Sequence, residues 1–138
     1  MRTSRQILTF LFAALLSTAL VAQADDSAAA KTAAASWLAT MDAADYAATW
    51  ETAAAAFKSS IAVAAWSQAA KSVRDPLGPM QSRAEKAVTM TTTLAGAPDG
   101  NYAVLQFDTT FANKAASVET LSLLLESGQW KVVGYFIK

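Results

Sequence analysis

The hydrophobic residues of this chain follow a helical period between residues 27 and 73 and a two-residue period from Lys86 onward, and this change constrains the fold most. Alanine, the strongest helix former, supplies almost half of the residues from 28 to 70. Pro76 and Pro79 follow this segment and cannot continue a helix. The sequence therefore predicts a helical half followed by a half of strands.

Large residues at helical spacing predict three helices in the first half, and each contains one tryptophan. Asp45 is a candidate N-cap for the second helix, and Ser59 or Ser60 for the third, because their side-chain oxygens can accept hydrogen bonds from backbone N–H groups. The expected buried stripes are Ala30, Ala34, Trp37, Leu38 and Met41; Tyr46, Trp50, Ala53, Ala54 and Phe57; and Val63, Trp66, Ala70 and Val73.

The second half contains four strand-like segments: AVTMTTTL, NYAVLQFDTTF, SVETLSLLLE and the closing GQWKVVGYFIK. The APDG segment is typical of a turn, and Ser127-Gly128 is typical of a two-residue hairpin. Three helices followed by four strands with short connections predict an α+β domain. We expect the three N-terminal helices to pack on a four-stranded antiparallel meander sheet.

The first residues of the chain have the pattern of a signal peptide, residues 1–24. Arg2 and Arg5 precede an apolar run over residues 7–20, and small residues lead up to Ala24. The run is shorter than the ~20 residues that a membrane-spanning helix needs. We therefore expect cleavage after Ala24, a periplasmic or secreted product without a membrane anchor, and a single domain at residues 25–138.

Residue types that are missing narrow the possible chemistry. The chain has no His and no Cys, which removes the usual zinc sites and the nucleophilic triads that rely on a His base. Its five glycines are not clustered as in phosphate-binding loops. After cleavage, eleven acidic and nine basic residues leave a net charge of −2, so nucleic acid and anionic membranes are not expected partners. We expect no cofactor.

The tight turn at Ser127-Gly128 sets the register of the last two strands, and register sets their faces. A regular ladder from this turn places Gly134 opposite Leu121 on the face that meets the helices, and Tyr135 on the outer face. Glu119 lies on the same inner face as Leu121. A carboxylate in this apolar row must be paired or protonated, because an isolated buried charge is very costly.

Two interpretations of Glu119 remain open. In the first, it forms a structural ion pair with Arg83 or Arg74, or reaches solvent past the sheet edge. In the second, Gly134 bends the sheet, and Glu119 with an arginine orients a ligand between tryptophan walls. The tryptophans fit a core better than a ligand platform. The candidate ligand-binding residues are Glu119, Arg83, Arg74, Trp37, Tyr46, Trp50, Trp130 and Gly134.

Four segments together resemble the domain of unknown function 4019 family, a family of small exported bacterial proteins: SWLATMDAADYAATWETAAAAFK, VRDPLGPMQSR, APDGNYAVLQFDTTFANK and ETLSLLLESGQWKVVGYFIK. The resemblance covers nearly all of residues 25–138. It implies export and one compact domain, and it implies no activity and no catalytic residue. The matching positions include Trp37, Asp42, Tyr46, Trp50, Trp66, Arg74, Gly78, Arg83, Pro98, Gly100, Phe107, Glu119, Trp130, Gly134 and Tyr135.

The order of the elements also resembles the cone-shaped nuclear-transport-factor-2-like fold. That fold includes isomerases, dehydratases and many non-catalytic binding domains, so the resemblance implies no single function.

The sequence leaves three functions open. The first is a non-catalytic exported domain that binds a small ligand or a protein partner at the helix–sheet cleft. The second is a small acid–base enzyme with Glu119 as base and a tyrosine such as Tyr46 as hydrogen-bond donor. The third is a structural or accessory domain that recruits another envelope protein through an apolar outer sheet face. That face would include Leu124, Val133, Tyr135 and Ile137.

Overall fold

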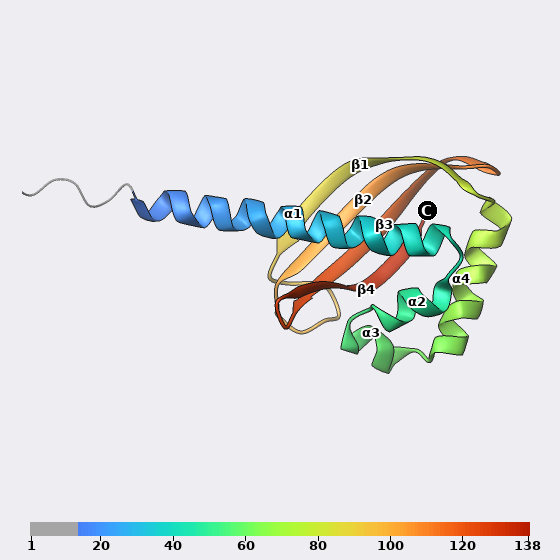
Figure 1. The fold of residues 1–138 in the computed structure, drawn as a ribbon, viewed down its shortest axis with the longest axis horizontal. Helices are drawn as coiled ribbons and strands as arrows, with labels where there is room; N and C mark the ends of the chain where they lie inside the picture. The colour runs from blue at the N-terminus through green and yellow to red at the C-terminus, as the bar shows by residue number, and fades with distance from the viewer. Residues whose placement is uncertain (1–13) are drawn as a thin grey trace, which may run out of the picture.

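A computed structural model describes residues 14–138, with side chains described from Gln23 onward. This part of the chain forms an α+β fold in which four helices are followed by four strands (Figure 1). The elements are α1 (Ala14–Asp42), α2 (Tyr46–Glu51), α3 (Ala55–Ser60), α4 (Val63–Leu77), β1 (Met80–Thr91), β2 (Tyr102–Phe111), β3 (Lys114–Glu126) and β4 (Gln129–Ile137).

The expected signal peptide falls partly on residues outside this range. Arg2, Arg5 and the start of the apolar run lie outside the described residues, and α1 runs continuously through Ala24. Within the described part of the chain, no helix combines the length and the apolar character needed to cross a membrane.

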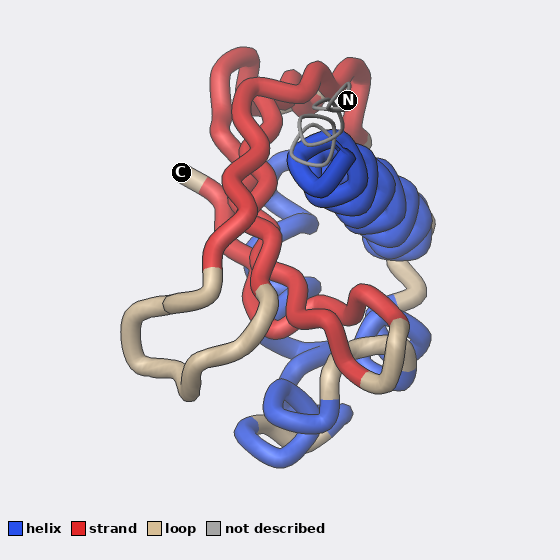
Figure 2. Tube along the Cα trace, turned by 90° about the vertical axis from the view of Figure 1, so that its left-hand side faces the viewer, coloured by secondary structure: helices blue, strands red, loops and turns tan. Residues whose placement is uncertain are grey.

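The four strands form one antiparallel sheet in the order β1-β2-β3-β4, which confirms the predicted meander. Figure 2 looks along α1 and shows the strands curving around this helix. The shorter helices α2, α3 and α4 gather at the C-terminal end of α1 (Figure 1). The helices therefore cover one face of a curved sheet.

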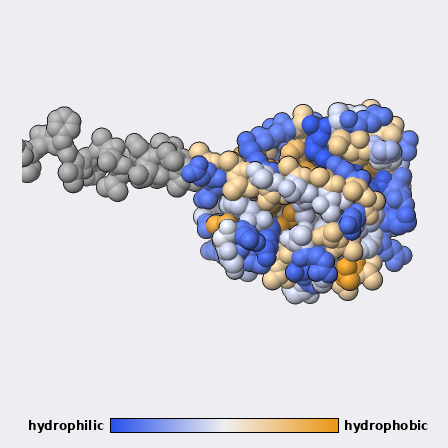
Figure 3. Space-filling view, in the orientation of Figure 1, coloured by the Kyte–Doolittle hydropathy of each residue, from blue (hydrophilic) through white to orange (hydrophobic). Residues whose placement is uncertain are grey.

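The core lies between α1 and the inner face of the sheet. The predicted stripe of α1 is confirmed, since Ala30, Ala34, Trp37, Leu38 and Met41 are all buried. Opposite them, the strands contribute Ala103, Leu105, Leu121, Leu123 and Val132. The outer side of α1 and its surroundings are a mixture of hydrophilic and weakly hydrophobic atoms, with strongly hydrophobic atoms visible only in small spots (Figure 3).

The helix predicted around Tyr46–Phe57 is divided into α2 and α3. Alanine propensity favours one continuous helix, but the N–H of Ala54 donates to the carbonyl oxygen of Val132 in β4 at 2.9 Å. The N–H of Ala55 donates to the Glu126 carboxylate at 3.0 Å. These bonds to the sheet replace bonds within a helix, so tertiary contacts override the local preference.

Both cap assignments can be compared with the helix ends. Asp45 caps α2 as predicted, because its side chain accepts a hydrogen bond from the N–H of Ala48 at 3.2 Å. The assignment of Ser59 or Ser60 as the next N-cap is wrong. Both are the last residues of α3, and α4 begins after Ala62 without a side-chain cap.

The exit of α4 is held by the turn between β2 and β3. Pro76 lies inside the last turn of α4, and Gly78 ends the helix with a φ of 73°, a conformation that favours glycine. A Cβ atom at Gly78 would lie 3.1 Å from the Cβ of Ala112. The N–H of Asn113 donates to the carbonyl oxygen of Leu77 at 2.9 Å. These contacts hold the end of α4 against the turn between β2 and β3.

The last hairpin has the predicted turn. Ser127 and Gly128 have positive φ angles of 52° and 78°, and Glu126 pairs with Gln129. Two successive positive φ angles are typical of the type I′ turn, which matches the twist of the two strands.

The regular ladder expected beyond this turn is wrong. The register shifts between Ser122 and Leu123, because β4 contains one extra residue there and forms a β-bulge. As a result Gly134 lies opposite Ser122, and Tyr135 lies opposite Leu121. The bulge moves Tyr135 to the inner face and Gly134 away from it.

Candidate functional site

Four charged side chains from four elements meet at the C-terminal end of α1, and we call them the charge cluster: Asp42 of α1, Arg74 of α4, Arg83 of β1 and Glu119 of β3. Glu119 is 0% exposed and Arg74 only 6%, and the other two side chains are nearly buried. Burying isolated charges is very costly, so these groups depend on one another.

Arg83 bridges the two carboxylates. Its Nε donates to Oε1 of Glu119 at 2.7 Å, and its Nη1 and Nη2 donate to Asp42 at 2.7 and 2.9 Å. Bidentate guanidinium–carboxylate bonds are among the strongest hydrogen bonds in proteins. Arg74 donates from Nη2 to the same Asp42 carboxylate at 2.8 Å. Of the two candidate arginines, Arg83 pairs with Glu119 and Arg74 pairs with Asp42.

Both carboxylate oxygens of Glu119 have further donors. The hydroxyl of Thr109 donates to Oε1 at 2.6 Å, and the hydroxyl of Tyr135 donates to Oε2. With Arg83, these donors surround a carboxylate that has no exposed surface. Glu119 is therefore part of a buried ion-pair network rather than a charge that reaches solvent past the sheet edge.

Tyr135 joins the cluster because of the bulge in β4. Burial raises the pKa of its hydroxyl, and the negative charge of Glu119 raises that pKa further. The phenol therefore stays protonated and donates to Glu119. Its ring packs edge-on against Trp37, with the ring centroids 5.1 Å apart.

Asp42 is the last residue of α1, where the negative end of the helix dipole opposes a negative charge. The two arginines offset this cost. Burial raises the pKa of Asp42, but the hydrogen bonds from Arg83 and Arg74 outweigh burial and hold that pKa below its ordinary value of 3.8. The folded state thus favours the ionised form of Asp42.

We predict that ionised Asp42 stabilises the fold down to acid pH. Because its folded-state pKa is lowered, its contribution is present above the unfolded pKa of 3.8 and is lost as the pH falls through the folded-state pKa. The melting temperature of Asp42→Asn should therefore change less between neutral pH and about pH 2.5 than that of the unchanged protein.

The control for this titration is Asp108→Asn. Asp108 is 61% exposed and lies 3.5 Å from Lys86, so it should keep the pH dependence of the unchanged protein. Equal pH dependence in all three proteins would contradict the role assigned to Asp42.

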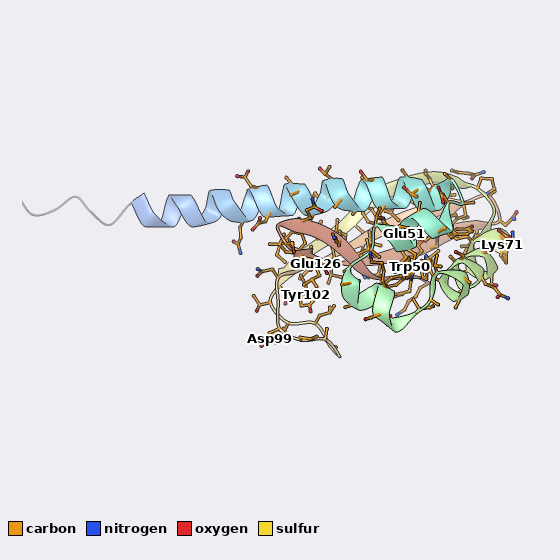
Figure 4. All side chains as sticks on the ribbon, turned by 60° about the horizontal axis from the view of Figure 1, so that its bottom comes forward. Trp50, Glu51, Lys71, Asp99, Tyr102 and Glu126 are labelled. Atoms are coloured by element: carbon orange, nitrogen blue, oxygen red, sulfur yellow. The ribbon has the colours of Figure 1, made fainter. Side chains whose placement is uncertain are left out.

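Three tryptophans bind the helical layer together. The indole N–H groups of Trp37 and Trp66 both donate to the buried Thr49, at 3.0 Å to its carbonyl oxygen and at 2.9 Å to its hydroxyl. Trp50 donates to the carbonyl oxygen of Ile61 at 2.8 Å, within the helical layer (Figure 4). The N–H groups of these three indoles therefore form hydrogen bonds that stabilise the fold.

A hollow of about 290 Å³ lies between α4 and β4, and we call it the α4–β4 hollow. Its walls are mostly apolar, and Arg74 and Tyr135 supply the polar groups. Val73 and Phe136 are 50% and 51% exposed and are the exposed large apolar side chains of the described residues. The lining residues are Trp66, Ala69, Ala70, Val73, Arg74, Tyr135, Phe136 and Ile137.

The predicted ligand-binding residues do not share one cleft. Tyr46 lines a separate hollow of about 310 Å³ with Asp42 and Arg74. Trp37 and Trp130 line a groove of about 390 Å³ between α1 and β4.

Other predicted residues lie elsewhere. Arg83 and Glu119 belong to the charge cluster, while Trp50 and Gly134 lie outside the walls of these three hollows. In Figure 4, Tyr102 and Glu126 lie at one end of the domain, and Lys71 of α4 lies at the other end.

The predicted site residues did not include Asp42 of the charge cluster, nor Thr109 and Tyr135, whose hydroxyls donate to Glu119. A signal existed for Asp42, because a carboxylate at the C-terminal end of a helix requires a compensating cation. No local signal identified Tyr135, because its position depends on the bulge.

In the described part of the chain, no group of His, Cys, Asp and Glu side chains has the arrangement needed to hold a metal ion.

No curated protein matches the chain. The model of one family, described as protein of unknown function (DUF4019), matches residues 33–135. This match covers most of the chain, and the chain therefore belongs to the DUF4019 family.

Proposed function

We propose that this chain is an exported, non-catalytic domain that binds a small amphipathic ligand in the α4–β4 hollow. The observation that carries the proposal is that Val73 and Phe136, the exposed large apolar side chains of the described residues, both line this one hollow. Exposed apolar surface gathered at one concave place is typical of binding sites.

The chemistry of the walls supports this choice. Trp66 offers an apolar ring there, because its N–H group already donates to Thr49. Arg74 and Tyr135 bring polar groups to the same hollow. An apolar cavity with a few convergent polar groups is the usual form of a small-ligand site, and about 290 Å³ is near the lower end of the usual sizes.

The position of Glu119 argues against the acid–base alternative. A general base must come within hydrogen-bond reach of the proton that it removes. Glu119 is 0% exposed, and Arg83, Thr109 and Tyr135 occupy its oxygens. A substrate would have to displace a buried donor to reach it.

Export is supported by the N-terminal sequence pattern and is compatible with the fold. The core residues of α1, from Ala30 to Met41, all follow the expected cleavage site after Ala24. Cleavage would therefore leave the packing of the domain intact.

Mass spectrometry of the protein recovered from expressing cells should find Asp25 as the first residue, and a product that retains its first residues in full would refute cleavage.

We predict that the hollow binds 1-hexanol, a short apolar chain with one polar end. Titration of the isotope-labelled protein should shift the amide resonances of Val73 and Ile137 saturably, with a Kd of roughly millimolar order for a ligand of this size. Val73→Asp should abolish the shifts, because it places a charge in the apolar wall.

The matched control is Ala65→Asp, at an exposed position of α4 that does not line the hollow. It should bind as the unchanged protein does. Shifts that do not saturate, or that are equal in both aspartate variants, would refute a site in the α4–β4 hollow.

A further inference from the structure

We infer that the ligand of the α4–β4 hollow is a short extended peptide segment that pairs with the outer edge of β4 as an added strand. This inference rests on the proposed function and adds the chemical class of the ligand. Its basis is the place of the hollow along β4 and the direction of the backbone groups there. A peptide is amphipathic in the required sense, because its backbone is polar and its side chains can be apolar.

The hollow reaches the edge of β4 rather than one of its faces. Three consecutive residues of the strand line it: Tyr135, Phe136 and Ile137. Successive side chains of a strand point to opposite faces, so Tyr135 and Ile137 share the inner face and Phe136 lies on the outer face. A hollow that touches all three residues must lie beside the strand, where the two faces meet. In the sheet that the described residues form, β4 is an edge strand.

The backbone groups of Tyr135 and Ile137 point to this edge. Lys138 and Val118 of β3 exchange two hydrogen bonds of 3.0 Å, so they form a hydrogen-bonded pair. In an antiparallel ladder, such pairs alternate with pairs whose N–H and C=O groups point away from the partner strand. The register is regular here, so Ile137 and Tyr135, one and three positions before Lys138, are of the second kind. Two N–H and two C=O groups therefore point away from β3, toward the hollow.

The outward groups lack backbone partners in the described part of the chain. Beyond the sheet ladder, no backbone hydrogen bond within the described residues reaches Tyr135 or Ile137. Nearer the start of β4, the same edge already accepts such a bond, because the carbonyl oxygen of Val132 takes the N–H of Ala54 at 2.9 Å. A strand edge with unpaired donors and acceptors is the usual place where an extended peptide adds to a sheet.

The surroundings of this edge favour a segment with an apolar residue next to an acidic one. Val73 and Phe136 are half-exposed at the hollow and can pack on an apolar side chain. No Asp or Glu of the described residues lines the hollow, and Lys138 Nζ lies 5.9 Å from the ring centroid of Phe136. Arg74 in the wall is paired with Asp42, so the exposed Lys138 supplies the unbalanced charge. An acidic residue in the segment complements this charge, and a basic residue opposes it.

The first test uses the peptide Thr-Val-Thr-Glu, acetylated and amidated at its ends, and two analogues with one N-methyl group, at the valine or at the threonine after it. In an added strand, the N–H groups of neighbouring residues point alternately toward β4 and away from it. One analogue should therefore bind as the parent peptide does, with a Kd of roughly millimolar order, and the other should have a Kd about tenfold higher or more. Saturable shifts of the Val73 amide resonance measure each Kd. Equal tolerance or equal loss in the two analogues would overturn strand pairing.

The same titrations separate this inference from the proposed function. Binding of 1-hexanol without binding of the parent peptide would overturn the peptide class and leave the proposed function standing. Binding of neither probe would refute the proposed function itself. A peptide with lysine in place of glutamate should bind more weakly at low salt, and tighter binding would overturn the acidic preference.

Ile137→Pro tests the protein side of the pairing. Proline lacks an N–H group, and the ladder stays intact because the N–H of Ile137 points away from β3. The Kd of the parent peptide should rise about tenfold more than that of 1-hexanol, whereas Ile137→Ala, which keeps the N–H, should change both Kd values by similar factors. The same ratio in both variants would overturn pairing at Ile137. The N-methyl comparison in the unchanged protein decides the ligand class even if Ile137→Pro does not fold.

Sedimentation of the unchanged protein, as recovered from cells, tests the competing occupant of the edge. A monomer is expected. A dimer that Ile137→Pro dissociates would assign the edge to a second copy of this chain and overturn the peptide ligand.

Discussion

Replacing Arg83 by methionine should lower the free energy of unfolding by about 3–5 kcal/mol, the usual cost of removing one partner from a buried ion pair. Arg83 gives hydrogen bonds to both Glu119 and Asp42, so its loss leaves two carboxylates with too little positive charge. The total free energy of unfolding of most small domains is only about 5–15 kcal/mol. Urea unfolding of the variant and the unchanged protein would measure this difference.

The matched control is Lys31→Met. Lys31 lies 3.1 Å from Glu85 in an ion pair whose side chains are 44% and 43% exposed. Exposed pairs contribute about 0–1 kcal/mol, so this variant should change stability little. If Arg83→Met costs no more than Lys31→Met, the charge cluster does not stabilise the fold in the way described.

A double variant separates the two parts of this cost. Adding Glu119→Gln to Arg83→Met removes one of the uncompensated carboxylates and should recover part of the lost stability. Recovery would assign the cost to the buried charge that remains. A double variant less stable than Arg83→Met would assign the loss to packing and hydrogen bonds instead.

Replacing Trp37 by alanine should lower the free energy of unfolding by about 3–5 kcal/mol, as is typical of a large side chain removed from a core. Trp37 is 5% exposed and packs against Tyr135 and Trp66 with ring centroids 5.1 and 6.3 Å apart. Its loss would also leave the carbonyl oxygen of Thr49 without its N–H donor.

Trp130→Ala is the comparison for this prediction. Trp130 is only partly buried, at the wall of the groove between α1 and β4, so its replacement should cost clearly less than that of Trp37. Equal costs for the two variants would contradict the assignment of Trp37 to the core. Chemical unfolding followed by circular dichroism avoids the change in fluorescence that both replacements cause.

The elements that the sequence predicted correctly depend on neighbours a few residues away. Asp45 caps a helix that begins at the next residue, and Ser127-Gly128 closes a two-residue turn. The stripe from Ala30 to Met41 follows from helical periodicity alone. Each of these features arises from the local geometry of the backbone, which a short stretch of sequence expresses.

The features that the sequence did not predict depend on contacts between distant residues. The break after α2 arises where Ala54 bonds to Val132 of β4, 78 positions later in the chain. The bulge in β4 places Tyr135 against Trp37 and Glu119. No pattern within β4 alone distinguishes this register from a regular one.

The candidate site also combines features that the sequence predicts with features that only the tertiary structure shows. The burial of Glu119 and the need for an arginine follow from one carboxylate in an apolar row of residues. The choice of Arg83, the second carboxylate at Asp42 and the separation of Tyr46 from Trp130 follow only from how α1, α4 and the sheet pack.

The sequence by itself determined the fold class, the order of the elements, the meander and the core face of α1, because periodicity and turn chemistry act over a few residues. The tertiary structure alone decided the register of β4, the partners in the charge cluster and the place of the α4–β4 hollow. These depend on which distant surfaces meet, and packing and the pairing of buried charges select among arrangements that local preferences leave equal.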